Sequence, residues 1–206
     1  MAYPHYRDKL VAMLGQDQRE VRAHARAYKH SPKSPDIITS RKQLNERCLQ
    51  RAKRMLKILD EIGAPTIDNI GTDGAQAMSV IALHSKYSIM KQVLAAFEAS
   101  YRNDPASVYL EVIPSLTDRV LLLERKKQRF GSQWLMGVDG KFFLYPVADF
   151  KYMNERRTQY GLDKARHPRD LTYGIPKGPL PPETQESDQR QPTQEEYDDQ
   201  MSEAFD

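Results

Sequence analysis

The sequence predicts a mainly α-helical protein: a helical bundle with one C-terminal β-hairpin and a disordered C-terminal tail. Three observations predict it. In several segments before Gly131, apolar residues recur every three to four positions, which is the helical period. After Gly131 the apolar period changes to two, as in a strand. Beyond Leu162 the chain becomes rich in proline and then in acidic residues, a composition that buries too little apolar surface to offset chain entropy.

The N-terminal segment is expected to form one helix with a weak centre. Residues 5–28 have apolar residues at helical spacing, and the pattern weakens after Gly15. The next segment, H-S-P-K-S-P-D at residues 30–36, contains two prolines and two serines that break any helix. We therefore expect residues 1–36 to form an N-terminal helix and a linker.

The second helix is the best specified in the chain. Ser40 with Gln43 makes a capping box at its start, and Gly63-Ala64-Pro65 ends it. Its apolar residues follow at three- and four-residue steps: Leu44, Cys48, Ala52, Met55, Leu56, Leu59 and Ile62. The other faces are basic. We attribute this charge first to solvation, because no aromatic residues interleave with it as a nucleic-acid stacking surface requires.

A turn-rich connector at residues 66–74 separates this helix from the next ones. Asn103-Asp104-Pro105 is typical of an N-cap followed by proline at the first helical position. The expected further helices run from Thr72 or Asp73 to Ser85, from about Ser88 to Tyr101, and onward from Pro114-Ser115.

A β-hairpin is expected after Gly131. Residues 134–137 and 141–145 flank Val138-Asp139-Gly140, and Asp-Gly is the strongest short hairpin signal.

A short helix is expected next, with Asp149 as its cap, Tyr160 at its end and Gly161 beyond it. We therefore expect residues 37–162 to form a helical core domain that includes the hairpin. Residues 163–206 are expected to form a Pro-rich and then acidic disordered tail.

The net charge of +3 conceals an asymmetry along the chain. Residues 181–206 contain nine acidic residues and one basic residue, so the rest of the chain is strongly basic. This distribution indicates either a nucleic-acid surface, with a tail that masks it, or solvated helix faces with a solubilising tail. The second interpretation is favoured.

Cysteine content and hydropathy exclude several classes of protein. The single cysteine, Cys48, excludes an intramolecular disulfide and a multi-cysteine zinc site, and its helical pattern predicts a buried hydrophobic position. No apolar run has the length of a signal peptide or a membrane span. We therefore expect a soluble, cytoplasmic protein that does not enter a membrane.

Polar residues that stand out from the helical pattern are candidates for a functional site. His84, beside the apolar stripe of its helix, is either a hydrogen-bonded core residue or the base of a pocket. Asp118 and Arg119 point about 100° apart on a helix, so one of them faces inward and needs a partner. Ser132 and Gln133 leave a tight glycine turn that could hold an anion or a carbonyl group. The structural alternative for this turn is a helix end followed by strand entry.

Several motifs resemble a bacterial family named domain of unknown function six-six-two-four. They are L-D-E-I-G-A-P-T-I at 59–67, I-A-L-H-S-K-Y at 81–87, S-L-T-D-R-V at 115–120, R-F-G-S-Q at 129–133 and D-F-K-Y-M-N-E-R-R-T-Q-Y-G-L at 149–162. The resemblance covers roughly residues 52–162 and leaves both ends of the chain outside. The matching positions are His84, Asp118, Arg119, Gly131, Gln133, Arg156, Arg157 and Gly161.

The chain departs from the family pattern at a few positions. It has Ser85-Lys86 where the family tends to Ala-Asp, and Phe130 and Ser132 in place of Tyr and Thr. If the missing acid were a metal ligand or a general acid, this chain would lack it. The family name carries no activity, so the resemblance implies a shared polar pocket without naming a substrate.

Two functional hypotheses follow. The first is a metal-independent hydrolase or group transferase acting on a small or peptide substrate. Its general base or acid is His84, Asp118 orients that histidine, and the substrate-binding residues are Arg119, Ser132, Gln133 and Arg156. No H-x-x-x-H motif or acid cluster points to a metal, and the sequence identifies no cofactor.

The second hypothesis is a non-catalytic interaction protein. Its basic helices and acidic tail would engage a protein or, less favoured, a nucleic acid, and its polar residues would be structural.

Overall fold

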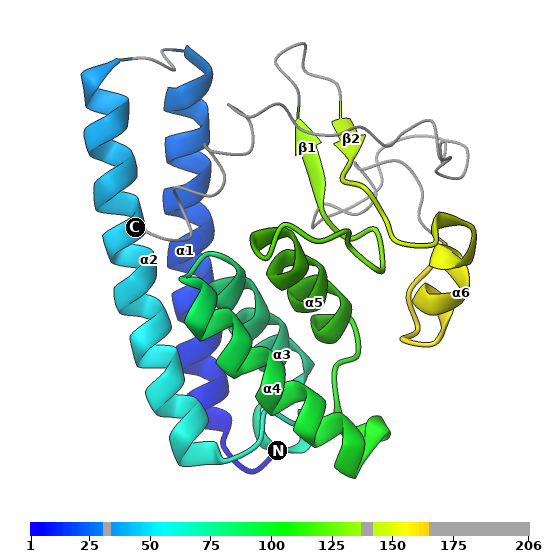
Figure 1. The fold of residues 1–206 in the computed structure, drawn as a ribbon. Helices are drawn as coiled ribbons and strands as arrows, with labels where there is room; N and C mark the ends of the chain where they lie inside the picture. Colours follow the sequence, from blue (N-terminus) through cyan, green and yellow to red (C-terminus); the bar gives the residue numbers. More distant parts are fainter. Residues whose placement is uncertain (31–33, 137–141, 165–206) are drawn as a thin grey trace. The chain divides into compact units, whose positions relative to one another are not determined.

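The computed structural model describes residues 1–30, 34–136 and 142–164. These residues are mainly helical, so the expected fold class is confirmed at this level (Figure 1). The elements are α1 (Pro4–His30), α2 (Pro35–Ile62), α3 (Ile67–Leu83), α4 (Tyr87–Asn103), the 3-10 turn η1 (Pro105–Ser107), α5 (Val112–Leu123), β1 (Trp134–Met136), β2 (Phe142–Leu144), the 3-10 turn η2 (Phe150–Tyr152) and α6 (Met153–Thr158). The expected hairpin turn at 138–140 and the expected tail beyond residue 164 lie outside the described residues.

The described chain divides into two compact units, one ending at Val112 and the other beginning at Ile113. The expected division into residues 1–36, a core domain over 37–162 and a tail stays a prediction. Helix α1 packs along both α3 and α2, so the N-terminal helix supplies part of the core of the first unit. Each unit is described below by itself.

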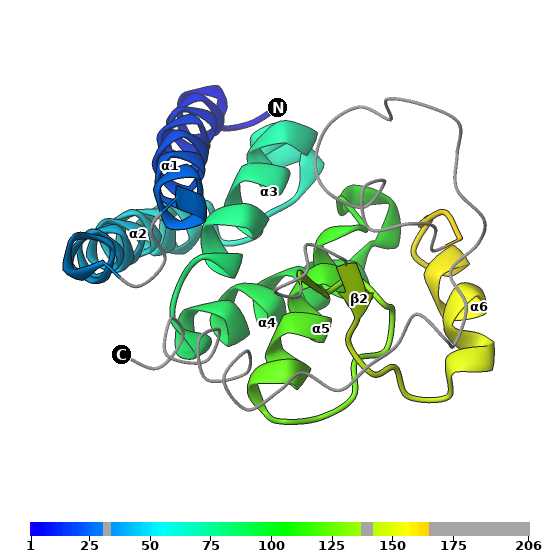
Figure 2. The ribbon, with the colours of Figure 1, turned by 90° about the horizontal axis from the view of Figure 1, so that it is seen from above.

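In the first unit, α1 and α2 lie side by side as a long antiparallel pair (Figures 1 and 2). The expected capping box of Ser40 with Gln43 is wrong, because α2 begins at Pro35. Ser34 is its N-cap, and the Ser34 hydroxyl accepts a hydrogen bond of 3.2 Å from the backbone N–H of Ile37. An N-cap serine, a proline at the first helical position and an acid in the first turn all favour this earlier start.

The core of the first unit surrounds α3, which packs against α1, α2 and α4. This helix is rich in small and apolar residues, so its neighbours can approach it closely on several sides. Large side chains that are less than 2% exposed include Leu10 from α1, Met55 from α2, Met78 and Ile81 from α3, and Met90 and Phe97 from α4.

Helix α3 differs from expectation at both ends. Its N-cap is Thr66, whose hydroxyl accepts from the backbone N–H of Asn69 at 3.2 Å, so part of the expected connector is helical. The helix is interrupted at Gly71, where φ is 71°. It ends at Leu83, and His84 is the C-cap rather than a residue within the helix.

Other boundaries are confirmed. Helix α2 stops at Gly63, whose φ is 71° and whose N–H donates to the Leu59 carbonyl at 3.0 Å. Helix α4 covers the expected 88–101 segment. Asp104 caps η1, its carboxylate accepting from the backbone N–H of Ala106 at 3.0 Å.

The second unit contains α5, the antiparallel pair β1 and β2, and the η2–α6 segment. Trp134 pairs with Leu144 across the two strands. Leu144, with Val147 and Met153, forms an apolar cluster against which Trp134 and Phe150 pack. These contacts join the strands to α6 within one small core.

Asp149 does not cap a helix as expected. Its backbone is left-handed, with φ 45° and ψ 58°, and its side chain makes no capping bond. The chain turns first through η2 and then through α6, which ends at Thr158. Gly161, with φ 67°, follows as expected, and its N–H donates to the Thr158 carbonyl at 3.1 Å.

Gly131 provides a test of packing in the second unit. Its φ is 64°, and a Cβ placed there would collide with the sulfur of Met153, which is only 1% exposed. Gly131→Ala should lower the free energy of unfolding by about 2–4 kcal/mol, from left-handed strain and overpacking together. Gly63→Ala is the control, since Gly63 also has a positive φ but its Cβ would meet nothing within 4 Å, and about 1 kcal/mol is expected. Urea denaturation would measure both variants, and an equal loss of unfolding free energy in the two would contradict tight packing at Gly131.

Candidate functional site

A buried ion pair links α1 to α2. Asp17 and Arg51 are 0% and 1% exposed. Arg51 donates to Asp17 Oδ1 through Nε at 3.2 Å and through Nη2 at 3.0 Å, and to Glu20 Oε2 through Nη1 at 2.7 Å. An unpaired charge at this depth would cost several kcal/mol, roughly. These bonds therefore offset the free-energy cost of burying the guanidinium.

His84 is also bonded to this pair. Its Nδ1 lies 2.6 Å from Asp17 Oδ2, so the two oxygens of the carboxylate are divided between Arg51 and His84. The His84 side chain is 31% exposed, and its Nε2 makes no hydrogen bond to the described part of the chain. We call Asp17, Glu20, Arg51 and His84 the ion cluster.

The ion cluster keeps its acids ionised. Burial alone would raise the pKa of Asp17, but the hydrogen bond and charge of His84, together with Arg51, hold that pKa below its usual value. Burial likewise opposes ionisation of Glu20, and the bond from Arg51 outweighs it, so its pKa is also lowered. The arrangement therefore contains two carboxylates beside one guanidinium and one imidazole.

Cys48 borders the ion cluster but is not suited to nucleophilic chemistry. It is buried, as expected, and its Sγ lies 3.6 Å from Asp17 Oδ1. Burial, reinforced by the Asp17 charge, raises the pKa of the thiol to about 11. Because the thiolate is the reactive form, Cys48 is inert near neutral pH.

Asp118, in the second unit, binds the backbone of the loop before β1. Its carboxylate is 0% exposed and accepts from the N–H groups of Arg129 at 2.7 Å, Phe130 at 3.0 Å and Ser132 at 2.9 Å. Burial raises the pKa of Asp118, and the backbone bonds oppose this rise. The side chain thus fastens this loop to α5.

Other residues predicted for the site gather around the same loop. Arg156 donates to the Arg129 carbonyl at 2.8 Å and to the Ala148 carbonyl at 2.6 Å. Ser132 and Gln133 are half-buried, and the Gln133 amide donates to the Ser132 hydroxyl at 3.3 Å.

Arg119, next to Asp118 on α5, is also half-buried. The second unit therefore brings together Asp118, Ser132, Gln133 and Arg156, whereas His84 belongs to the first unit. The proposed orientation of His84 by Asp118 stays a prediction.

Two further buried polar residues bind this loop, and neither was among the residues predicted for the site. Gln128, 0% exposed, donates to the Tyr145 carbonyl at 2.7 Å and accepts from the Gln133 N–H at 3.0 Å. Arg157, 2% exposed, donates to the Phe130 carbonyl at 2.9 Å. Both bind main-chain groups of a segment without regular structure, a role that no local sequence pattern indicates.

Asp17 and Arg51 were also not among the predicted site residues, although the sequence contains a signal for them. Asp17 continues the helical stripe of Leu10 and Leu14, and Arg51 stands between Cys48 and Met55 on the stripe of α2. A charge on each of two apolar stripes, with opposite signs, indicates that the helices face each other there.

The described helices include none that is long and apolar enough to cross a membrane. Within residues 1–30, 34–136 and 142–164, no three His, Cys, Asp or Glu side chains gather as metal ligands would. Comparisons with protein-family models, with curated proteins and with solved structures found no match to this chain. The family resemblance seen in the motifs stays a prediction.

Arg51 is the residue on which we expect the ion cluster to depend most. Arg51→Met leaves the buried Asp17 carboxylate without its guanidinium and should lower the free energy of unfolding by about 3–5 kcal/mol. The double variant Asp17→Leu with Arg51→Met removes both buried charges and should recover much of that loss. Arg54→Met, an exposed change on the same helix, is the control. Urea denaturation would measure all three, and a double variant less stable than Arg51→Met would contradict the account.

Acidification should weaken the ion cluster. Because the pKa of Asp17 is lowered on folding, its stabilisation is complete above the ordinary value of about 3.9 and is lost as the pH falls through the lowered value. The difference in unfolding free energy between the wild type and Asp17→Asn should therefore shrink as the pH falls below about 4. Urea denaturation at stepped pH would check this, and a constant difference would count against it.

Proposed function

We propose that the protein is a metal-independent hydrolase or group transferase in which His84 serves as general base or acid toward a small or peptide substrate. One observation carries the proposal: the 2.6 Å contact between His84 Nδ1 and the buried Asp17 carboxylate, on a ring that is 31% exposed. A carboxylate at Nδ1 fixes the ring orientation and its tautomer, and leaves Nε2 to exchange a proton with a substrate. In this proposal Asp17 is the positioning residue.

The charge balance of the ion cluster supports this role. Asp17 and Glu20 are held ionised beside a single guanidinium. A proton taken up by His84 would make these four groups neutral in sum, so the transferred proton would leave no unpaired buried charge. A histidine that served only to fill the core would not need an exposed ring face.

The expected orientation of His84 by Asp118 is not part of this proposal, because Asp17 is bonded to His84 Nδ1 and Asp118 is bonded to the loop before β1. Arg119, Ser132, Gln133 and Arg156, in the second unit, stay the predicted substrate-binding residues. For Gln133 one feature favours this, because its side-chain carbonyl accepts no hydrogen bond within the described residues and the residue is half-buried. A β-hairpin turn at residues 138–140 and a disordered acidic tail over residues 163–206 likewise stay predictions.

A second candidate is a non-catalytic protein that binds an acidic protein or, less favoured, a nucleic acid. The observation that favours it is the charge of the α1–α2 pair, since residues 16–57 contain twelve Lys and Arg against four Asp and Glu. Such a partner would dissociate steeply as salt is raised.

The catalytic proposal predicts that turnover depends on His84. The full-length protein would be assayed with chromogenic ester, amide and phosphoester substrates beside His84→Gln. Loss of a general base should lower kcat by about 10²-fold or more. His24→Gln is a matched control, because His24 is also a half-buried histidine, with its Nδ1 3.3 Å from the Ser40 hydroxyl. Turnover should survive that change.

Nitrogen-detected NMR of the imidazoles gives a separate check of the geometry. His84 should carry its proton on Nδ1 in the wild type and lose this preference in Asp17→Asn. Equal turnover in His84→Gln and wild type, or no turnover of any substrate, would contradict the proposal that the protein is an enzyme. Salt-sensitive binding of an acidic peptide would then support the second candidate.

A further inference from the structure

We propose that a groove on α2 binds a small phosphorylated molecule that also carries hydroxyl or amino groups, such as a sugar phosphate or a nucleotide. The groove has a volume of about 320 Å³. It is lined by Arg47, Arg51 and Arg54, by three glutamines and by Glu46, with one glutamine contributed by α1. We call it the arginine groove. The inference does not depend on the catalytic proposal.

The three arginines share one face of α2. Their spacing of four and then three residues is that of neighbours on a helix surface. At a rise of about 1.5 Å per residue, Arg47 and Arg54 lie roughly 10 Å apart along the helix axis. Their side chains can therefore reach one ligand from both ends of the groove.

Two of the arginines are held in place before any ligand arrives. Arg47 Nε and Arg51 Nη1 donate to the same oxygen of Glu20, at 3.1 Å and 2.7 Å. The Nη groups of Arg47 remain for another acceptor, because its only hydrogen bond in the described part of the chain uses Nε. Preorganised guanidinium groups lose little side-chain entropy on binding an anion.

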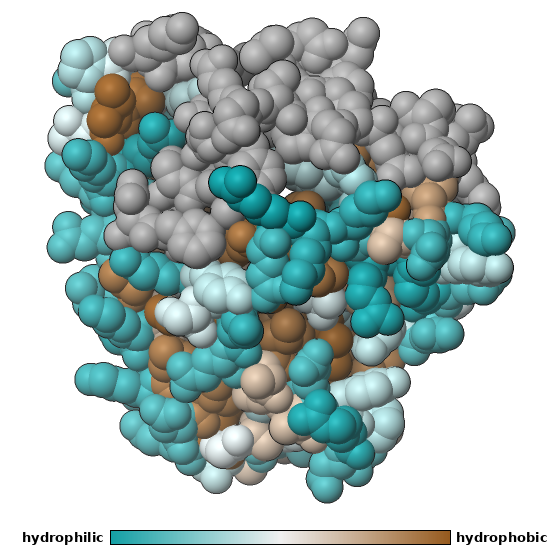
Figure 3. Space-filling view, viewed as in Figure 1, coloured by the Kyte–Doolittle hydropathy of each residue, from teal (hydrophilic) through white to brown (hydrophobic). Residues whose placement is uncertain are grey.

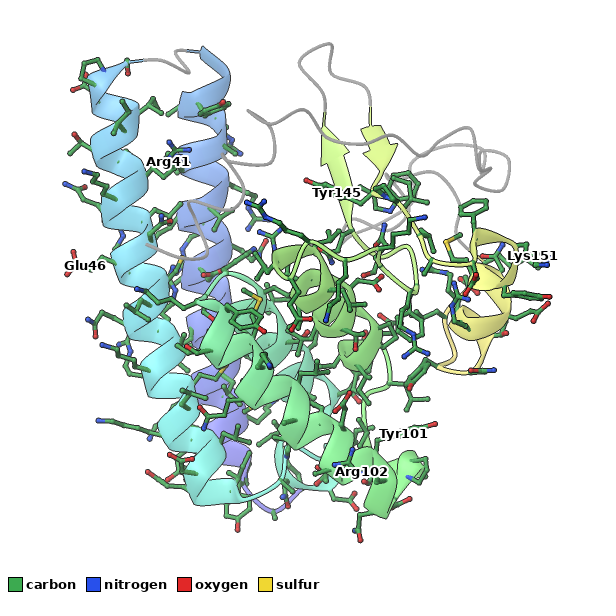
Figure 4. All side chains as sticks on the ribbon, in the orientation of Figure 1. Arg41, Glu46, Tyr101, Arg102, Tyr145 and Lys151 are labelled. Atoms are coloured by element: carbon green, nitrogen blue, oxygen red, sulfur yellow. The ribbon has the colours of Figure 1, made fainter. Side chains whose placement is uncertain are left out.

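The third arginine is free to close on a ligand. Arg54 is exposed and forms no hydrogen bond or ion pair with the described residues. Figure 4 shows polar side chains projecting along α2, Glu46 among them, and hydrophilic residues predominate along this edge of the molecule in Figure 3.

The chemistry of the lining selects a phosphorylated ligand. A planar guanidinium matches the oxygens of a phosphate in a two-pronged contact, which makes arginine the preferred residue for this group. Glu46 and the glutamine carbonyl groups are acceptors, so the rest of the ligand must offer O–H or N–H donors. The volume is at the lower end of the range of about 300–1,000 Å³ for small-molecule sites.

Arg51 also connects the arginine groove to the ion cluster. It lines the groove and donates to Asp17, whose other oxygen bonds His84. A phosphate that competes with Glu20 for Arg51 will shift this guanidinium slightly and disturb the Asp17–His84 contact. Binding should therefore be visible at His84 as well as in the groove.

The proposal is tested by titrating the isotope-labelled full-length protein with ribose 5-phosphate, ribose and inorganic phosphate in NMR experiments. Ribose 5-phosphate should shift the Nε–H signals of Arg47, Arg51 and Arg54 at lower concentration than inorganic phosphate does. Ribose alone should shift none of them. The ring signals of His84 should move with the same dissociation constant.

A matched pair of variants separates a specific site from general charge attraction. Arg54→Gln removes one groove cation and should raise the Kd by about tenfold or more, as expected for a charged hydrogen bond. Lys53→Gln removes the same charge from the adjacent exposed residue, which does not line the groove, and should leave the Kd within about twofold. Both changes are on the surface, so unchanged spectra without ligand show that the fold is intact.

Three results would overturn the proposal. Equal weakening by the two variants would mean attraction to the basic helix as a whole. Equal affinity for ribose 5-phosphate and inorganic phosphate would mean an adventitious anion position only. No shift of the arginine signals at millimolar ligand would mean that the groove binds no phosphorylated ligand of this class.

Discussion

The bond between Asp17 and Arg51 is the constraint on which the first unit depends. Each residue occupies a position on the apolar stripe of its helix, so either charge alone would be buried without a partner. Only the alignment of α1 and α2 that brings the two together avoids this penalty. The pair therefore favours one relative position of the two long helices. His84, bonded to the same carboxylate, extends this constraint to the end of α3.

The second unit depends on hydrogen bonds from side chains to buried main-chain groups. Between α5 and β1 the chain has little regular structure, so its buried N–H and C=O groups need side-chain partners. Asp118 accepts from three backbone N–H groups, while Gln128 and Arg157 donate to carbonyls nearby. Each of these side chains is almost fully buried. One unit is thus organised by charge against charge, and the other by side chains bonded to the main chain.

The buried guanidinium of Arg51 connects the core of the first unit to the arginine groove. Arg51 is 1% exposed in the ion cluster, yet it also lines the arginine groove. Its stability role and a binding role are compatible because its several N–H groups point to different acceptors. Coupling between the groove and His84 needs no conformational switch, since a single side chain contacts both neighbourhoods.

The sequence by itself determined the helical character of the chain and several boundaries. Periodicity revealed α2 and α4, and Gly63 and Asp104-Pro105 marked ends and starts, because these signals depend only on nearby residues. The start of α2 was misplaced, because the prolines of residues 30–36 were taken as helix breakers although Ser34 and Pro35 together also form a valid helix start. Only the tertiary structure decided the partner of His84 and the burial of Arg51. Those depend on Asp17, which is distant in sequence, and a buried charge is stable only where folding brings its counter-charge.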